Sequence, residues 1–164
     1  MSSATLSPRS RAAAATRLRR NPTSSSSPTP PKTFTVAEAQ ALLPQAIPLV
    51  EQLQDVQRSI VRTNHELDEL IGKLSHGNGY PVKAIKDQIQ RLTKHQLRLI
   101  EAFQSALQSL EALGCELKDL TRGLIDFYGL RDGELVCLCW KVGEERIRFW
   151  HTLEAGYAGR QPLD

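Results

Sequence analysis

The feature that most constrains this fold is a pair of seven-residue apolar repeats separated by a short glycine-rich segment. The first repeat consists of Ala46, Leu53, Ile60, Leu67 and Leu74. The second consists of Ile85, Leu92, Leu99, Ala106 and Leu113. Such a stripe lines one side of a helix, as in a coiled coil. Residues 75–81 between the repeats contain two glycines, an asparagine and a proline. A turn this short makes the helices antiparallel, so the sequence predicts a helical hairpin over residues 35–113.

Local signals mark the ends of this hairpin. Thr35 and Glu38 have the spacing of a capping box, in which each side chain bonds the backbone N–H of the other residue. Gly114 directly follows the last apolar position and suits a helix stop. Pro44 and Pro48 lie inside the first repeat. Since proline lacks an N–H and clashes with the preceding turn, they predict a kink or a short break there.

The apolar faces of the predicted hairpin are wider than one seam. Val50, Ile71, Ile100 and Leu107 flank the two stripes. Two helices alone cannot cover faces of this width. A second hairpin, or the small β-rich unit, must cover the excess. The sequence favours self-association, with a homodimer whose two hairpins form a four-helix arrangement.

Beyond residue 114 the helical period ends. Apolar and β-branched residues favour strands over residues 124–128, 134–140 and 146–151, and glycine-containing turns separate these segments. These segments predict a small antiparallel sheet of about three strands in a β-rich unit at residues 115–164. The expected fold class is therefore α+β, with hairpin and sheet in a single domain over residues 34–164.

Residues 1–33 have a different composition. They are rich in serine, proline and alanine and carry six basic residues and no acid. Such a segment has little to bury, so it is predicted to be a disordered basic extension. The rest of the chain has 15 basic and 18 acidic residues, which gives no electrostatic reason to expect nucleic-acid binding by the domain.

The same composition bears on location. No apolar run approaches the about 20 residues needed to span a bilayer, so no membrane partner is expected. The odd number of cysteines, three, favours a reducing compartment. We expect a cytoplasmic protein. In a plant or alga, the Arg-rich and acid-free extension would instead indicate a chloroplast transit peptide.

Chemically versatile side chains gather in the β-rich unit. The candidate site residues are Asp126, Cys139, Trp140, Glu144, Trp150, His151 and Arg160. Together they offer a general base, a thiol nucleophile, aromatic stacking surfaces and an arginine for an anion. The mix suits a small anionic ligand. No complete catalytic constellation is present, and no cofactor or metal site is expected.

Each candidate also has a structural interpretation. A carboxylate on an apolar strand needs a partner, and the candidate partners of Asp126 are Arg122, Arg148 and Arg160. The two tryptophans suit core packing or a dimer interface as well as a ligand. The segment 156–160 either holds an anion through its glycines and Arg160, or docks on Asp126 or Glu144.

The register of the last hairpin decides what Cys137, Cys139 and His151 do. If Trp140 pairs with Ile147, the cysteines and His151 lie on opposite faces of the sheet. If Cys139 pairs with Phe149, all three share a face and could converge on zinc. Cys-x-Cys is not the usual zinc spacing, so buried structural cysteines are the preferred interpretation.

Four segments resemble the bacterial domain of unknown function 2203. They are Gly123-Leu124-Ile125-Asp126-Phe127, Leu138-Cys139-Trp140-Lys141-Val142-Gly143-Glu144, Phe149-Trp150-His151 and Gly156-Tyr157-Ala158-Gly159-Arg160. Phe34, Glu38, Ala39, Leu42, Leu43 and Pro44 resemble the opening of that family. The resemblance covers about residues 34–164. It implies a small cytoplasmic protein of bacterial type and supplies no activity, substrate or catalytic residue.

Two functions remain as expectations. The preferred one is a non-enzymatic, self-associating interaction module, because no catalytic constellation is complete. The alternative is an enzyme or binder of a small anionic ligand that uses the candidate residues of the β-rich unit.

Overall fold

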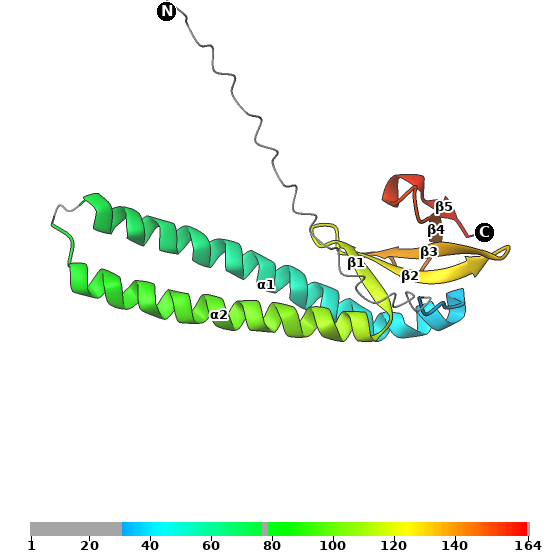
Figure 1. Cartoon of the computed structure of the whole chain (residues 1–164), viewed down its shortest axis with the longest axis horizontal. Coiled ribbons are helices and arrows are strands. Elements are labelled where there is room, and N and C mark those ends of the chain that lie inside the picture. Colours follow the sequence, from blue (N-terminus) through cyan, green and yellow to red (C-terminus); the bar gives the residue numbers. More distant parts are fainter. Residues whose placement is uncertain (1–30, 77–78, 164) are drawn as a thin grey trace, which may run out of the picture. The chain divides into compact units, whose positions relative to one another are not determined.

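The computed structural model describes residues 31–76 and 79–163 (Figure 1). Most of the predicted disordered extension, and Gly77 and Asn78 of the predicted turn, lie outside the described residues. From Pro31 onward the chain forms one compact unit. Its elements are α1 (Val36–His76), α2 (Val82–Ala112), β1 (Cys115–Asp119), β2 (Leu124–Arg131), β3 (Glu134–Lys141), β4 (Phe149–Thr152), the 3-10 turn η1 (Tyr157–Gly159) and β5 (Gln161–Pro162).

Helix α1 begins with the predicted capping box. The backbone N–H of Thr35 donates to Glu38 Oε2 at 2.8 Å, and the N–H of Glu38 donates to Thr35 Oγ1 at 3.2 Å. Of the predicted kink or short break, the break is not formed, because α1 runs through Pro44 and Pro48 without interruption. Leu43, Ala46 and Val50 are fully buried in the core around these prolines, and that burial offsets the lost backbone hydrogen bonds.

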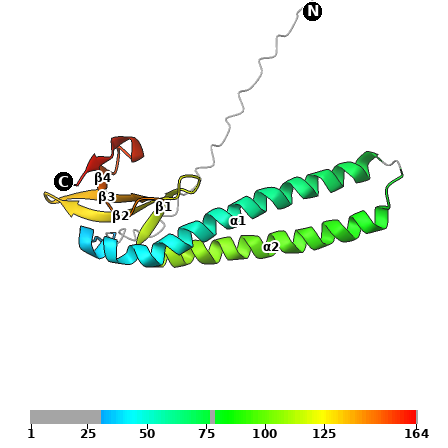
Figure 2. The same cartoon turned by 180° about the vertical axis from the view of Figure 1, so that it is seen from behind.

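The two helices form the predicted antiparallel hairpin (Figures 1 and 2). Leu53 and Leu70 of α1 and Ile85 and Leu110 of α2 are buried. The predicted stop is confirmed at Gly114, whose φ of 91° is a conformation that glycine adopts without strain.

The β-rich unit is a single antiparallel sheet with the strand order β1-β2-β3-β4-β5. The sequence predicted an antiparallel sheet of about three strands. The antiparallel sheet is confirmed, but the number of strands is wrong, because the sheet has five. The missed strands are β1 and β5 at the sheet edges. β1 alternates charged with apolar residues, and β5 is only two residues long. Short edge strands owe their structure to the neighbour they pair with, so their local sequence signal is weak.

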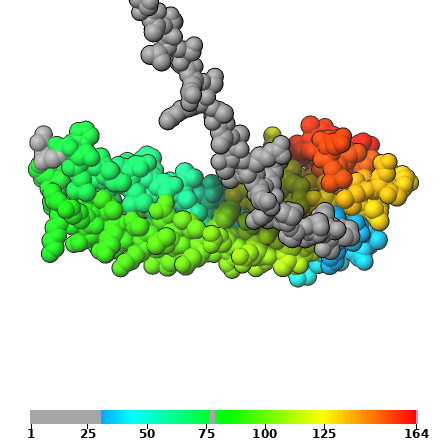
Figure 3. All heavy atoms as spheres, viewed as in Figure 1, coloured from blue at the N-terminus to red at the C-terminus, as the bar shows by residue number. Residues whose placement is uncertain are grey.

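One face of the sheet packs on the hairpin. Ile125, Phe127, Leu138 and Trp140 share a core with the first half of α1 and the end of α2. Figure 3 shows the yellow to red atoms of the sheet at one end of the hairpin and green atoms toward its other end. Alternate side chains of β2, β3 and β4 therefore point away from the helices, and the candidate site is built on this outer face.

Neither helix contains a stretch apolar enough to serve as a membrane-spanning segment.

Candidate functional site

The observed register brings the candidate side chains to the outer face. Strands β3 and β4 pair Cys139 with Phe149 and Cys137 with His151. This is the register in which the two cysteines and His151 share a face. Strands β2 and β3 pair Asp126 with Cys139, so Asp126 joins them. The alternative pairing of Trp140 with Ile147 is not formed.

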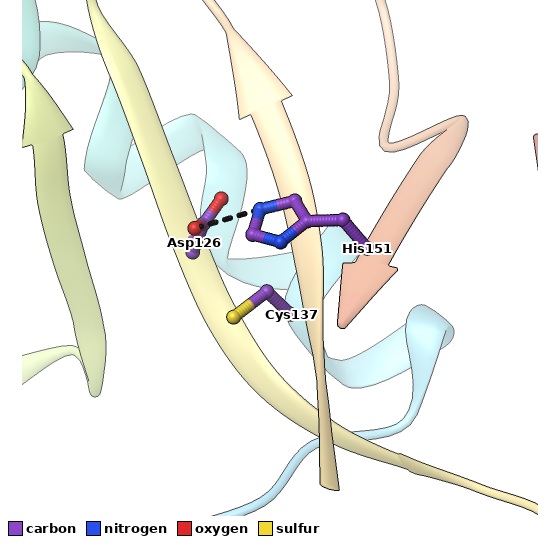
Figure 4. A group of neighbouring side chains, drawn as sticks. All are labelled: Asp126, Cys137 and His151. Atoms are coloured by element: carbon purple, nitrogen blue, oxygen red, sulfur yellow. Dashed lines mark hydrogen bonds and ion pairs between the residues drawn. The ribbon is translucent and has the colours of Figure 1, made fainter. Parts of the chain in front are cut away.

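Asp126, Cys137 and His151 form a compact buried cluster (Figure 4). One ligand atom from each, a carboxylate oxygen, the thiol sulfur and a ring nitrogen, lies within 4.8 Å of the other two. His151 Nε2 is 3.0 Å from Asp126 Oδ2. Both side chains are only 3% exposed. The partner of Asp126 is thus His151 instead of the predicted arginine, because the register puts both side chains on the outer face, where they meet across β3.

The hydrogen bonds of the cluster are incomplete. His151 Nδ1 is 2.8 Å from the carbonyl oxygen of Thr152, so Nδ1 carries a proton and donates it. Asp126 Oδ1 is buried and has no hydrogen-bond partner among the described residues. A buried carboxylate oxygen without a partner is costly, and such atoms often mark a site that takes an ion or ligand.

The thiols of this face are held in their neutral form. Burial, and then the negative charge of Asp126, raise the pKa of Cys137 to about 11. The same causes raise the pKa of Cys139 well above its ordinary range. Cys139 is also fully buried. A thiol nucleophile needs access and a lowered pKa, and Cys139 has neither.

A pocket of about 280 Å³ opens above the cluster. Asp126, Cys137 and His151 line it together with Lys118, Arg122 and Tyr157. The Arg122 guanidinium lies 5.0 Å from the centre of the Tyr157 ring. The pocket therefore combines a buried polar cluster, the two cations, the carboxylate of Asp119 and an aromatic ring.

Glu144 and Arg160 form a separate group. Arg160 donates to both carboxylate oxygens of Glu144, at 2.9 and 2.8 Å, and to the carbonyl oxygen of Cys139 at 3.3 Å. The guanidinium also lies 4.3 Å from the centre of the Phe149 ring. The predicted docking of segment 156–160 on Glu144 is confirmed, and this pair fastens the C-terminal segment to the sheet.

The two tryptophans lie on the helix-facing side of the sheet. Trp140 is fully buried, and its Nε1–H donates to the carbonyl oxygen of Glu144 at 2.8 Å. Trp150 is half-buried against the same core, with the Arg131 guanidinium 4.7 Å from its ring centre. Neither residue lines the pocket, so the structure separates them from Asp126 and His151.

The candidate site residues expected from the sequence did not include Cys137, Lys118, Arg122 or Tyr157, although Cys137 was considered as a zinc ligand and Arg122 as a partner of Asp126. Cys137 had a signal, because it lies two residues before Cys139 and shares its face. Lys118 belongs to the unpredicted strand β1, and Arg122 follows that strand. Their approach to the pocket therefore depends on the pairing of β1 with β2.

Comparison with known proteins gives a family and no activity. A search of curated proteins and a search of solved structures found no match. Residues 32–163 match the model of the family described as "Uncharacterized conserved protein (DUF2203)". The match covers most of the chain and agrees with the resemblance of its sequence motifs, so the protein belongs to the DUF2203 family.

Proposed function

We propose that the domain binds a small anionic ligand in the pocket above Asp126, Cys137 and His151. The observation that carries the proposal is that Lys118 and Arg122 line a pocket floored by a buried polar cluster. A volume of about 280 Å³ suits a small molecule. Apolar contact with the Tyr157 ring and ionic contact with the two cations are complementary means of holding it.

Both cations are available to a ligand. Lys118 pairs with Glu116, and Arg122 Nε is 3.7 Å from Asp119 Oδ2. These pairs are solvent-accessible, and an ion pair of this kind contributes about 0–1 kcal/mol. An incoming anion can therefore replace the present partners at little cost, while the Tyr157 ring keeps the Arg122 guanidinium in place.

The test is titration of the full chain with inorganic phosphate, acetate and citrate, followed by NMR chemical shifts. We expect shifts at Lys118, Arg122 and Tyr157. Lys118→Gln and Arg122→Gln should each weaken binding about tenfold, the effect of one charge-assisted hydrogen bond. Arg131→Gln is the matched control, because Arg131 lies on Trp150 away from the pocket. No shifts with any anion, or an equal loss in the control, would contradict the proposal.

A second candidate function, self-association as an interaction module, is favoured by the far half of the hairpin. Val61, Leu97 and Ile71 are 58%, 57% and 51% exposed. The side-chain amide of Gln96 on α2 donates a hydrogen bond to the side-chain oxygen of Asn64 on α1. Val61 lies about one turn before Asn64, and Ile100 lies about one turn after Gln96. Because the helices are antiparallel, Val61 and Ile100 lie at the same level of the hairpin. We propose that a second copy covers this surface. Dimers in sedimentation at high micromolar concentration would support this candidate function, and a strict monomer would remove it.

A further inference from the structure

The donor set at the pocket floor is one that transition metals use. A cysteine thiolate, an imidazole and a carboxylate are the side-chain ligands of zinc in proteins, so Cys137 would release its proton to solvent when the ion binds. Here they come from three neighbouring strands, Asp126 from β2, Cys137 from β3 and His151 from β4, and point toward one another (Figure 4). Because each ligand sits on a paired strand, the backbone holds them at fixed relative positions.

The orientation of His151 also suits a metal. Its Nδ1–H donates to the carbonyl oxygen of Thr152, which leaves Nε2 as the ligand nitrogen. Metal-binding histidines commonly use one nitrogen in this way to fix the ring. Nε2 and Asp126 Oδ2 are 3.0 Å apart. Two such ligands on a tetrahedral zinc ion are about 3.4 Å apart, so a small outward movement admits the ion.

An ion pair between Asp126 and His151 explains only part of this geometry. It accounts for the contact between Nε2 and Oδ2. It leaves Asp126 Oδ1 without a hydrogen-bond partner among the described residues, although the buried thiol of Cys137 lies on the same face. A cation between the three side chains would compensate the buried carboxylate and use all three donors.

We infer that Asp126, Cys137 and His151 bind a zinc-type transition-metal ion at the floor of the pocket. The thiol and imidazole select against magnesium and calcium, which take oxygen ligands. Three protein ligands leave a fourth position open, as in catalytic zinc sites, and here it faces the pocket. A carboxylate or phosphate oxygen would occupy it while Lys118 and Arg122 hold the same anion. This last step rests on the proposed anion site, whereas the metal site itself does not.

The test is metal binding by the reduced, full-length chain. We expect about one equivalent of Zn²⁺ per chain and a raised melting temperature. Co²⁺ as a probe should give a sulfur-to-cobalt charge-transfer band. Cys137→Ser should weaken binding more than about 100-fold and abolish the band, since losing a ligand exceeds the effect of losing an outer hydrogen bond. Cys115→Ser, a buried cysteine on the helix-facing side, should change neither.

The outcomes separate the two proposals. Absence of Zn²⁺ binding by the wild-type chain, a Co²⁺ complex without the sulfur band, or equal loss in the two cysteine variants would overturn the metal site. If Cys137→Ser does not fold, the sulfur band of the wild-type complex decides alone. Phosphate is then titrated into metal-free and Zn²⁺-loaded protein. Zn²⁺ binding without phosphate binding upholds the metal site and refutes the anion site. Phosphate binding without Zn²⁺ binding upholds the anion site and refutes the metal site.

Discussion

The three cysteines are all buried, yet their surroundings differ. Cys137 and Cys139 lie beside Asp126 on the outer face of the sheet. Cys115 lies in the core, where its thiol donates to the carbonyl oxygen of Leu110 at 3.3 Å. A thiol in such a place acts as a small apolar side chain with one weak hydrogen bond. Residue type alone therefore does not separate a cysteine of the core from a cysteine of the site.

Cys115 makes the free energy of unfolding decrease as the pH rises through the alkaline range. Burial raises its pKa from 9.0 to about 12. Below pH 9.0 the thiol is protonated in both folded and unfolded chains, so its full contribution is present. Between pH 9.0 and about 12 only the unfolded chain loses the proton, so stability falls by about 1.4 kcal/mol per pH unit. In Cys115→Ala this part of the decline should disappear. Urea denaturation between neutral pH and pH 11 measures it, and identical pH dependence in both proteins would show the expectation to be wrong.

At the scale of elements, the C-terminal segment is held mainly by side chains. Strand β5 contributes only two residues to the sheet, and the last backbone bond runs from Leu163 N–H to the carbonyl oxygen of Arg148. Arg160 and Glu144 supply the stronger attachment, since a bidentate pair with exposures of only 11% and 18% is little screened by water. This segment includes Gly156 and Tyr157, which line the pocket.

Breaking this pair should loosen the segment and destabilise the domain. We expect Arg160→Met and Glu144→Gln each to cost about 3 kcal/mol, because each leaves a part-buried charge unpaired. The double variant should cost less than the sum, since neither charge is then left alone. Arg58→Met is the matched control, as Arg58 pairs with Asp55 on an exposed helix surface and should change stability by less than about 1 kcal/mol. Chemical denaturation checks this, and costs as small as that of the control would mean that the pair does not hold the segment.

For the whole molecule, the core is unevenly distributed. The first half of α1 and the end of α2 pack under the sheet, whereas Thr63, Leu70 and Ile85 are the buried residues described in the far half of the hairpin. A two-helix structure with so few buried side chains is poorly stabilised by itself. A second hairpin packed against it would supply the missing burial.

Disrupting this surface should therefore weaken self-association without unfolding the domain. We expect Val61→Lys to raise the constant for dissociation of the proposed dimer at least about tenfold, because it replaces an exposed apolar side chain of this half of the hairpin with a charge. Leu130→Lys is the control, as Leu130 is 63% exposed and belongs to strand β2 instead of the helical hairpin. Analytical ultracentrifugation gives both constants. An equal effect of the two substitutions would mean that the dimer interface is not on this surface.

Several features follow from the sequence because short-range interactions determine them. The heptad stripes predict the two helices, Thr35 and Glu38 the start of α1, and Gly114 the end of α2. The β-branched and apolar segments predict β2 and β3. Each of these signals acts within one or two turns of helix or along one strand, so it is present in the local sequence.

Tertiary structure alone decided the rest. Helix α1 stays continuous through Pro44 and Pro48 because its apolar side is buried in the core under the sheet, and β1 and β5 form because they pair with β2 and β4. The sequence allowed two registers for the pairing of β3 with β4. A shift of one residue moves each side chain of β4 to the opposite face of the sheet, and the local sequence pattern is compatible with both registers. Packing of one sheet face on the hairpin accompanies the observed register, which sends Cys137 and His151 outward to meet Asp126.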